Sequence, residues 1–277
     1  MGISAVRASR VCGGHLAGAS GAEIWREVEY TNMKHFFQHS RYLFVLAHPD
    51  DEIYTCAFIQ QLVNDGKRVD ILFATSGDYH GMEMASVREA EARISMQLLN
   101  VPMANVHFLR VPERQLMCQV SAVREHILAL AATVLPDCVV GHDFEGGHDG
   151  HDALSFCSSR VAEELRISLY VFPAYHGRPE ERLWNQLVSP RVATDTLTLS
   201  PMMKILQARV IAAHASQSEF FDMVRRSSSC EVFTIREILR FVSEPIDYAT
   251  LPTTPIGYEY PGSARRYEDF TSAIGLA

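Results

Sequence analysis

Two clusters of histidine and acidic side chains stand out in the sequence, each directly after a short apolar run. The first is His48-Pro49-Asp50-Asp51-Glu52, and the second, in a glycine-rich stretch, contains His148 and His151. Zinc accepts imidazole nitrogens and carboxylate oxygens, and a catalytic zinc takes three protein ligands and keeps one position open. We therefore predict a zinc site formed by His48, Asp51 and His151, with Fe²⁺ as an alternative metal for such a set.

The same clusters contain two more groups that could take part in a hydrolysis. A zinc ion lowers the pKa of its water towards ~7, and a carboxylate beside the metal can then accept the proton. Asp50 is the candidate for this general base. His148, the remaining histidine, could be cationic and stabilise an oxyanion, or protonate a leaving amine.

The hydrophobic pattern predicts alternating strands and helices around these clusters. Strands are expected at 42–47, 69–74, 106–111, 138–141 and 168–173, and helices at 53–63, 86–99, 120–134 and 151–166. A further strand at 196–199 and helices at 202–214 and 234–243 are expected after them. In the helix at 86–99, Val87, Ala90, Ile94 and Leu98 form the expected apolar stripe. The alternation predicts an α/β fold with a Rossmann-like, doubly wound, mostly parallel sheet and helices on both faces.

This fold would bring the two clusters together although they are far apart in the sequence. Both follow predicted strands of one sheet, and the carboxyl ends of parallel strands share one edge, where ligands bind. We predict three parts of the chain: an irregular N-terminal segment at 1–38, a catalytic domain at 39–226, and a C-terminal extension at 227–277 that packs on the same domain.

Composition excludes several classes of partner. The net charge of -8 disfavours binding to nucleic acid or to anionic membrane surfaces. No apolar run approaches the length of a transmembrane helix, so we expect no membrane insertion. The six cysteines contain no C-x-x-C pair and are interpreted as reduced thiols of a cytoplasmic protein.

The two clusters resemble the signature motifs of the PIG-L/LmbE-like zinc N-deacetylases. Ala47 to Glu52 is similar to the first motif, and Gly147-His148-Asp149-Gly150-His151 to the second. The family includes deacetylases of N-acetylglucosaminyl-phosphatidylinositol, of a mycothiol precursor and of antibiotic aminosugars. The resemblance implies that His48, Asp51 and His151 bind the metal, that Asp50 is the base, and that His148 is the electrostatic or acid catalyst.

Weaker landmarks extend the resemblance over about residues 40 to 220. Thr75-Ser76-Gly77 is similar to the family's T-x-G turn, and the segment from His214 to Gln217 to its H-x-S-Q segment. Arg88 lies in an R-x-x-E helix whose arginine contacts substrate in the family. Three places depart from the pattern. Asp149-Gly150 stands between the two histidines where many members have Pro-Asp, Gly146 stands where several bacterial members have a tyrosine, and Glu113 where members have an aspartate that holds sugar hydroxyls. Arg88 and Glu113 are the predicted substrate-binding residues.

The predicted function is the zinc-dependent removal of an N-acetyl group from a small molecule that contains an aminosugar, with Asp50 as the base. Two alternatives stay open from the sequence: a metal-dependent lyase or hydratase on the same scaffold, and a metal-binding relative without catalytic activity. A homo-oligomer is also left open.

Overall fold

A mixed eight-stranded sheet forms the centre of the computed structural model, which describes residues 30–31, 35–188, 194–226, 235–253 and 255–276. Its strands, in spatial order, are β1 (Tyr30–Thr31), β9 (Thr194–Thr198), β10 (Arg236–Phe241), β6 (Ser168–Phe172), β5 (Cys138–His142), β2 (Arg41–Leu46), β3 (Arg68–Thr75) and β4 (Val106–Val111). The five strands from β6 to β4 are parallel to one another, while β10, β9 and β1 each pair antiparallel with a neighbour. A separate hairpin pairs β7 (Tyr175–His176) with β8 (Leu183–Trp184).

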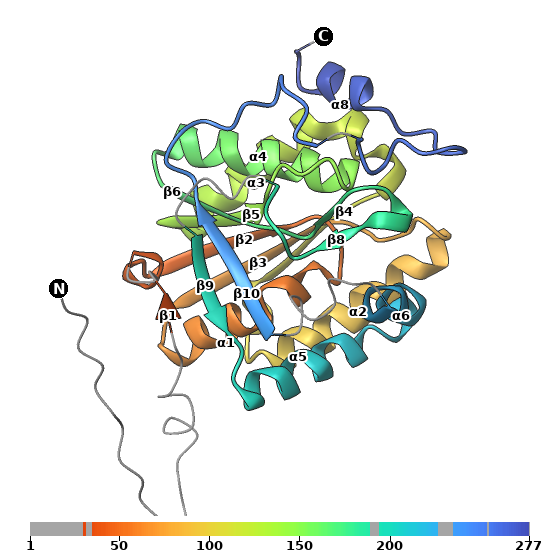
Figure 1. Ribbon diagram of the computed structural model, residues 1–277. Helices are drawn as coiled ribbons and strands as arrows, with labels where there is room; N and C mark the ends of the chain where they lie inside the picture. The colour runs from red at the N-terminus through yellow and green to blue at the C-terminus, as the bar shows by residue number, and fades with distance from the viewer. Residues whose placement is uncertain (1–29, 32–34, 189–193, 227–234, 254, 277) are drawn as a thin grey trace, which may run out of the picture.

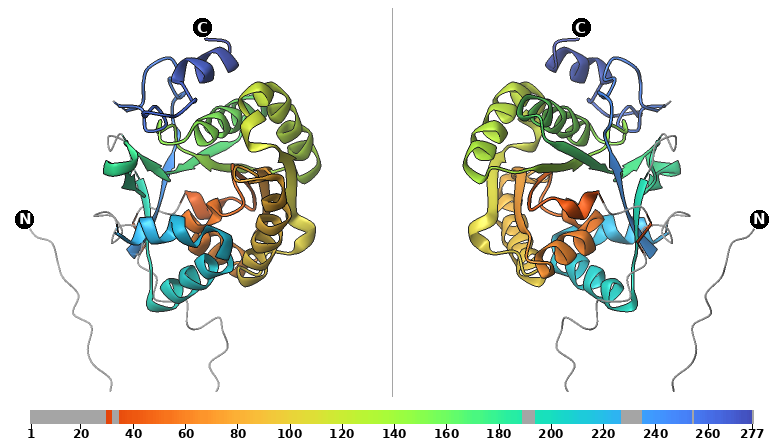
Figure 2. Two further views of the ribbon diagram at one scale, coloured as in Figure 1. Left: turned by 90° about the vertical axis from the view of Figure 1, so that its right-hand side faces the viewer. Right: turned by 90° about the vertical axis from the view of Figure 1, so that its left-hand side faces the viewer.

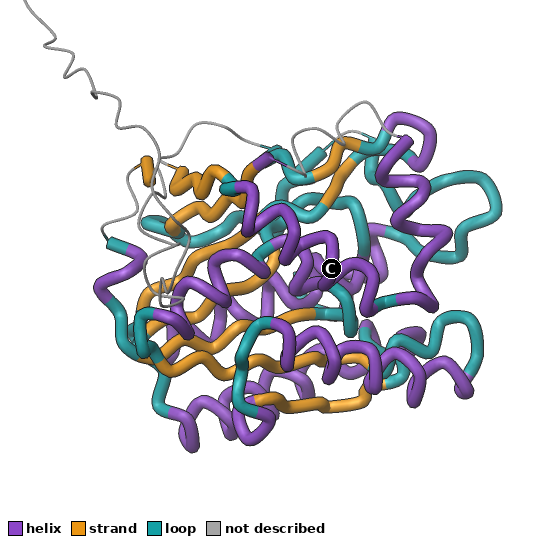
Figure 3. The backbone as a smooth tube through the Cα atoms, turned by 90° about the horizontal axis from the view of Figure 1, so that it is seen from below, coloured by secondary structure: helices purple, strands orange, loops and turns teal. Residues whose placement is uncertain are grey.

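Helices cover both faces of the sheet. On one face lie α1 (Cys56–Asn64), α2 (Met82–Leu98) and α5 (Pro201–Ala213), and α6 (Ser218–Arg226) follows α5 (Figure 1). The other face carries α3 (Val120–Val134) and α4 (Asp149–Leu165), with the short α8 (Tyr267–Ala273) packed against α4. The end-on views of Figure 2 show the two helical layers with the sheet between them, and Figure 3, seen from below, shows helices lying in front of the strands. The predicted Rossmann-like, mostly parallel α/β fold is confirmed.

Strand β2 shows why the sheet is covered on both sides. Tyr42 and Phe44 pack into the apolar core on one face, while Leu43 and Val45 pack into the core on the other. Successive side chains of a strand point to opposite faces, and a parallel strand buried on both faces reads as an unbroken apolar run. The apolar run at 42–47 thus indicates a central strand of the sheet.

The sheet reverses its order of winding at β2, which lies between β3 and β5. The chain proceeds from β2 outward through β3 and β4, returns to pair β5 on the other side of β2, and continues to β6. At such a switch point the loops that follow the two neighbouring strands diverge to opposite faces and leave a crevice between them. The loops after β2 and β5 carry the two histidine clusters, so the topology brings them to one crevice.

The helix predicted at 234–243 is wrong in its described part, because residues 236–241 form strand β10. β10 lies between β9 and β6 and pairs antiparallel with both. Its sequence, Arg-Glu-Ile-Leu-Arg-Phe, is rich in helix formers. The sheet position overrides that local preference, because Ile238 and Leu239 are buried only when the segment is extended between two partners.

The apolar stripe predicted for α2 is also wrong, although the helix itself is present. Val87 and Ile94 are exposed, and the buried face contains Arg88, Glu91 and Ala92 together with Ser95 and Met96. Polar residues occupy this face because it borders the crevice described below. A hydrophobic pattern cannot identify such a face, since its buried positions are charged.

The predicted division of the chain stays a prediction, with one addition from the structure. The segment after residue 227 contributes β10 to the sheet and α8 to the layer of α4. Most of the predicted irregular segment 1–38 lies outside the described residues. The four cysteines of the described part, Cys56, Cys118, Cys138 and Cys157, are free thiols. Among the described residues, no helix has the length and apolar character that a membrane span requires.

Candidate metal centre

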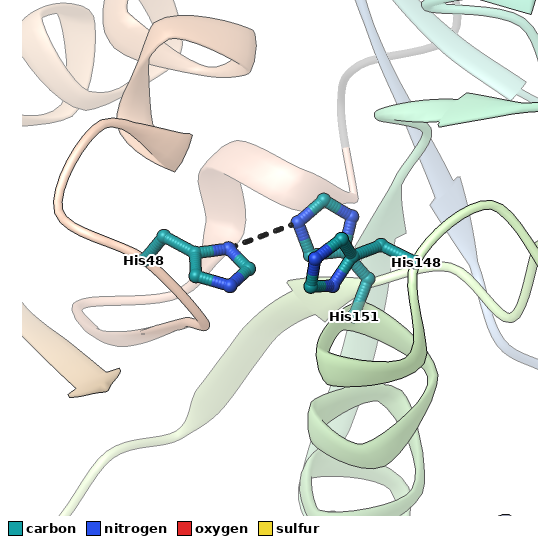
Figure 4. A group of neighbouring side chains, drawn as sticks. All are labelled: His48, His148 and His151. Atoms are coloured by element: carbon teal, nitrogen blue, oxygen red, sulfur yellow. Dashed lines mark hydrogen bonds between the residues drawn. The ribbon is translucent and has the colours of Figure 1, made fainter. Parts of the chain in front are cut away.

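The histidines of the two sequence clusters meet at the carboxyl edge of the sheet. His48 comes from the loop after β2, while His148 and His151 come from the start of α4, and their rings face one another (Figure 4). His48 and His151 are almost fully buried. They line a cavity of about 130 Å³ that also contains Asp50 and Tyr175 in its wall.

The three predicted ligands, His48, Asp51 and His151, lie next to one another. The Nδ1 atom of His48 is 3.3 Å from Nε2 of His151. The Asp51 carboxylate is 3.4 Å from the first atom through Oδ2 and 3.3 Å from the second through Oδ1. The donor types, two imidazole nitrogens and one carboxylate, suit zinc, and Asp51 meets the two imidazoles through different oxygens of its carboxylate.

Neighbouring residues offer two other sets of ligand atoms within reach of one another. One set is His48, His148 and His151, and the other is Asp51, His142 and His151. His142, in the last position of β5, is fully buried, stacks on the ring of His151 at 4.1 Å, and has its Nε2 atom 3.2 Å from Asp51 Oδ2. The predicted ligand set shares two members with each group. The assignment of the three ligands thus stays a prediction, with His142 as an added neighbour that can orient Asp51.

The electrostatics of the ligand atoms suit a cation. Burial acts to raise the pKa of Asp51, but His151 and His142 hold it well below its usual range. Burial lowers the pKa of His151 to about 3, so its ring is neutral and has a lone pair to donate. At His48 burial also lowers the pKa, yet the carboxylates of Asp51 and Glu113 raise it by more. The two carboxylates thus favour a positive charge at His48, either a proton on its ring or a metal ion bound to it.

Asp50 is held beside this centre by Arg88. The Nη2 atom of Arg88 donates to Asp50 Oδ1 at 2.7 Å, and both side chains are buried. Burial raises the pKa of Asp50 to about 6, although the ion pair with Arg88 acts to lower it. A carboxylate with a pKa near neutrality is suited to accept and return a proton. The structure thus places Arg88, a predicted substrate ligand, in the cavity wall and in direct contact with the predicted base.

Gly77 explains how Arg88 reaches that position. Its φ is +68°, and a β-carbon there would lie 2.8 Å from Cδ of Arg88. The Nη1 atom of Arg88 also donates to the carbonyl oxygen of Gly77 at 3.3 Å. A left-handed backbone without a side chain is what glycine supplies, so this turn of the T-x-G segment is shaped around the arginine.

Glu113 and His148 close the other side of the cavity. Glu113 Oε1 lies 3.7 Å from Nε2 of His48 and 3.8 Å from Nε2 of His148. The Nδ1 atom of His148 accepts a hydrogen bond from the backbone N–H of Gly150 at 3.0 Å. We expected a cationic His148, but burial first, with His48 and Arg265, lowers its pKa well below the usual range. The Nδ1 atom of His148 also lies 3.4 Å from Oδ1 of Asp149, which accepts from the same N–H of Gly150, and its Nε2 atom lies 2.7 Å from Nη1 of Arg265.

The late H-x-S-Q segment contacts the same region from α5. His214 Nε2 is 2.6 Å from Oε1 of Glu52, and both side chains are fully buried. Ser216 donates its hydroxyl to Glu91 at 2.6 Å. These pairs tie the first cluster and α2 to the end of α5, so His214 and Ser216 support the cavity rather than line it.

One charged residue beside the site was not foreseen, namely Arg265 of the C-terminal segment. It lies 2.7 Å from His148 and 2.6 Å from Asp149. No pattern in the sequence marks it, because it lies far beyond the second cluster in a stretch without strand or helix periodicity. Tyr54, which lines the cavity, was likewise not singled out.

A family model matches the part of the chain that carries both clusters. Residues 43–162 match the family described as GlcNAc-PI de-N-acetylase, PIG-L, which confirms the predicted resemblance. A search among curated proteins found no match.

Solved structures of deacetylases share the fold at low sequence identity. One is the N,N'-diacetylchitobiose deacetylase from Pyrococcus horikoshii, which is 16% identical with a TM-score of 0.57, covering 76% of this chain and 87% of that chain. Another is a deacetylase of the teicoplanin biosynthesis pathway, 13% identical with a TM-score of 0.56, covering 73% of this chain and 97% of that chain. At this level of identity, the likeness concerns the fold.

Proposed function

We propose that this chain, whose residues 43–162 match the PIG-L family model, is a metal-dependent N-deacetylase. Its proposed reaction is the hydrolysis of an N-acetyl group on a small molecule that contains an aminosugar, giving acetate and a free amine. Similar structures include a deacetylase of N,N'-diacetylchitobiose, and the matching family is named for a GlcNAc compound. Both facts favour an N-acetylated aminosugar as the substrate.

The observation that carries the proposal is the arrangement of two adjacent carboxylates. Asp51 lies 3.3–3.4 Å from the nitrogen atoms of His48 and His151, whereas Asp50 is turned to Arg88. One carboxylate is thus available as a ligand and the next one as a base. A site that only stores a metal has no use for the second, buried carboxylate with a raised pKa.

Each group of the chain has a definite task in the proposed hydrolysis. Zinc bound by His48, Asp51 and His151 would supply Lewis acidity, which polarises an amide carbonyl and makes a water molecule more acidic. Asp50 accepts a proton from the attacking water on Oδ2, since Arg88 holds Oδ1. His148, which lies beside the predicted metal ligands, would stabilise the carbonyl oxygen as it becomes an oxyanion. Asp50 then returns its proton to the nitrogen, so that the C–N bond breaks and the amine leaves neutral.

The proposal is tested with purified protein, its bound metal measured by mass spectrometry before and after chelation. Release of acetate and amine is followed on a panel of N-acetylated aminosugars, glycosides and antibiotic intermediates. Asp50→Asn is expected to keep the metal and to lose about 10²- to 10⁴-fold in kcat. The control is Asp222→Asn, the same change at an exposed carboxylate of α6, which should retain activity.

Two results would contradict the proposal, each in a different part. A variant Asp50→Asn with full turnover would remove the assignment of the base. A metal-loaded wild-type protein that releases no acetate from any member of the panel would remove the deacetylase activity. Water addition to unsaturated acids by such a protein would instead favour a hydratase.

A further inference from the structure

A second hollow lies beside the cavity of the candidate metal centre. Its volume is about 780 Å³, and Tyr79 and Glu113 line both this hollow and the cavity of about 130 Å³ at the metal centre. Pockets that hold a whole small molecule measure about 300–1,000 Å³. The cavity at the metal centre is smaller than this range, whereas the second hollow lies within it. We call the second hollow the outer groove.

Two stretches of the chain form most of the wall of the outer groove. One is the segment after β4, at 113–118, and the other is the C-terminal segment at 260–273, which includes α8. α8 packs against α4 and against residues 117–119, and Figure 1 shows it next to α4. The loop that carries Tyr79 is tied to the first stretch, because Asp78 Oδ1 accepts a hydrogen bond from the N–H of Glu113 at 2.8 Å. The C-terminal segment therefore forms one side of a groove that borders the metal centre.

The charges in the wall of the outer groove balance one another. Its charged side chains are three arginines and three carboxylates, namely Arg114, Arg265, Arg266, Glu113, Asp149 and Asp269. Arg265 is held between two of the carboxylates, since its Nη1 atom is 2.6 Å from Oδ1 of Asp149 and its Nη2 atom is 3.4 Å from Oε1 of Glu113. Neither an anion nor a cation would meet an excess of the opposite charge here. The outer groove thus suits a ligand without net charge.

The groups in the wall suit a ring that carries hydroxyl groups. A guanidinium N–H donates, a carboxylate oxygen accepts, and a hydroxyl group can do both. A hydroxyl can therefore bind to a neighbouring guanidinium and carboxylate at once, such as those of Arg265 and Asp149. The ring of Tyr260 lines the same groove and is 40% exposed. A few placed polar groups beside an aromatic surface are typical of ligand pockets, and a sugar ring offers hydroxyls at its rim and C–H groups on its faces.

We propose that the outer groove binds a second sugar ring, linked to the acetylated aminosugar whose amide lies at the metal centre. The inference rests on the proposed deacetylase function. In a 2-acetamido sugar the carbon that bears the amide is next to the anomeric carbon, so a ring linked there lies close to the reacting bond. Tyr79 and Glu113, which line both hollows, stand where the linkage passes. The C-terminal segment then determines specificity for the part of the substrate that does not react.

The test compares kcat/KM of the metal-loaded wild-type protein on N-acetylglucosamine, N,N'-diacetylchitobiose and N-acetylglucosamine 1-phosphate, with acetate release as the readout. Two added hydrogen bonds of ordinary strength predict a kcat/KM about 10- to 100-fold higher for the disaccharide than for the single sugar. The phosphate adds charge but no second ring, so its kcat/KM should resemble that of the single sugar.

Two variants probe the outer groove itself. Tyr260→Ala removes the aromatic surface and should lower kcat/KM for the disaccharide about 3- to 10-fold, mainly through KM. Ala264 is exposed in the groove, and Ala264→Trp fills it, so the disaccharide should fall to the level of the single sugar. Neither variant should change kcat/KM for N-acetylglucosamine, because neither residue lines the cavity at the metal centre.

The matched controls are Leu251→Ala and Ala249→Trp. Both residues are exposed and lie earlier in the C-terminal part of the chain, but neither lines the outer groove. The two control variants should keep the wild-type ratio between the kcat/KM values for the disaccharide and for the single sugar. Circular dichroism and metal content of all variants must match those of the wild-type protein.

Several outcomes would overturn the role of the outer groove. These are equal kcat/KM for the single sugar and the disaccharide, a preference for the disaccharide that Ala264→Trp leaves intact, and a kcat/KM for the phosphate above that for the disaccharide, which would make an anion the occupant. Acetate release from other members of the panel but from none of these three compounds would also overturn it. In each case the deacetylase proposal survives. A wild-type protein that releases no acetate from any compound refutes that proposal, and the role of the groove with it.

Discussion

The effects of substituting Arg88 and Asp50 on the free energy of unfolding should be strongly non-additive, because the two side chains form a buried ion pair. Its atoms are 2.7 Å apart, and the side chains are 7% and 11% exposed. Removing one partner of a buried pair leaves an uncompensated charge and costs about 3–5 kcal/mol. Arg88→Met should therefore lower the free energy of unfolding by that amount. The double variant Arg88→Met/Asp50→Asn leaves no unpaired buried charge. Its loss of unfolding free energy should therefore be about 2–3 kcal/mol smaller than the sum of the losses of the two single variants.

The assay is a double-mutant cycle by urea unfolding, with all proteins freed of metal by a chelator so that metal binding does not contribute. The control is Arg93→Met on the same helix. Arg93 is 41% exposed and pairs with Glu89 at 2.8 Å, and an exposed pair contributes about 0–1 kcal/mol. Kinetics on metal-loaded Arg88→Met then divide the roles of the arginine. A fall in kcat reports the positioning of Asp50, and a rise in KM reports the predicted contact with substrate.

One result would refute the physical reasoning for this pair. If Arg88→Met and Asp50→Asn each cost less than about 1 kcal/mol and their effects add, water must solvate both charges in the native protein. The pair would then not be buried as described, and the raised pKa of Asp50 would lose its cause.

Three other expectations concern the metal, the sheet and the turn. His151→Ala should abolish stoichiometric zinc binding, while His142→Gln should weaken it about 10- to 100-fold, as measured by chelator competition. If His142→Gln abolished zinc binding and His151→Ala only weakened it, His142 would be the ligand in place of His151. Burial raises the pKa of Glu237 from 4.5 to about 8, so its contribution to stability is fully present below about pH 4.5 and is lost as the pH rises through 8. The free energy of unfolding should fall by about 1.4 kcal/mol per pH unit between these values, and urea unfolding at pH 5 and pH 8 should show a smaller fall for Glu237→Gln. Gly77→Ala should cost about 2–3 kcal/mol, from the left-handed backbone and the displacement of Arg88, and a loss under about 0.5 kcal/mol in urea unfolding would show that the turn adapts.

The parallel core and the metal-binding clusters were readable in the sequence for a simple reason. A strand buried on both faces must be apolar throughout, as at 42–47, and the polar residues that follow it must lie at the edge of the sheet. His48 and His151 could therefore be assigned to one site before any distance was known. The same logic failed for β10, because its extended form depends on neighbours that are distant in sequence.

The buried face of α2 could not be predicted from the sequence either. Hydrophobicity marked Val87 and Ile94 as the inner side, whereas Arg88 and Glu91 are buried. Charged residues are buried only where partners neutralise them, and those partners, Asp50 and Ser216, come from the first cluster and the end of α5. A one-dimensional pattern contains no information about such partners.

The sequence by itself determined the class of fold, the resemblance to a family and the residues that could bind a metal, because these follow from local apolar runs and from short motifs. Only the tertiary structure decided what each charge faces: Arg88 contacts Asp50, His142 contacts Asp51, and Arg265 contacts His148. Electrostatic interactions depend on distances across elements and on the exclusion of water. Both are properties of the packed chain, so the division of roles around His48, Asp51 and His151 emerges only after folding.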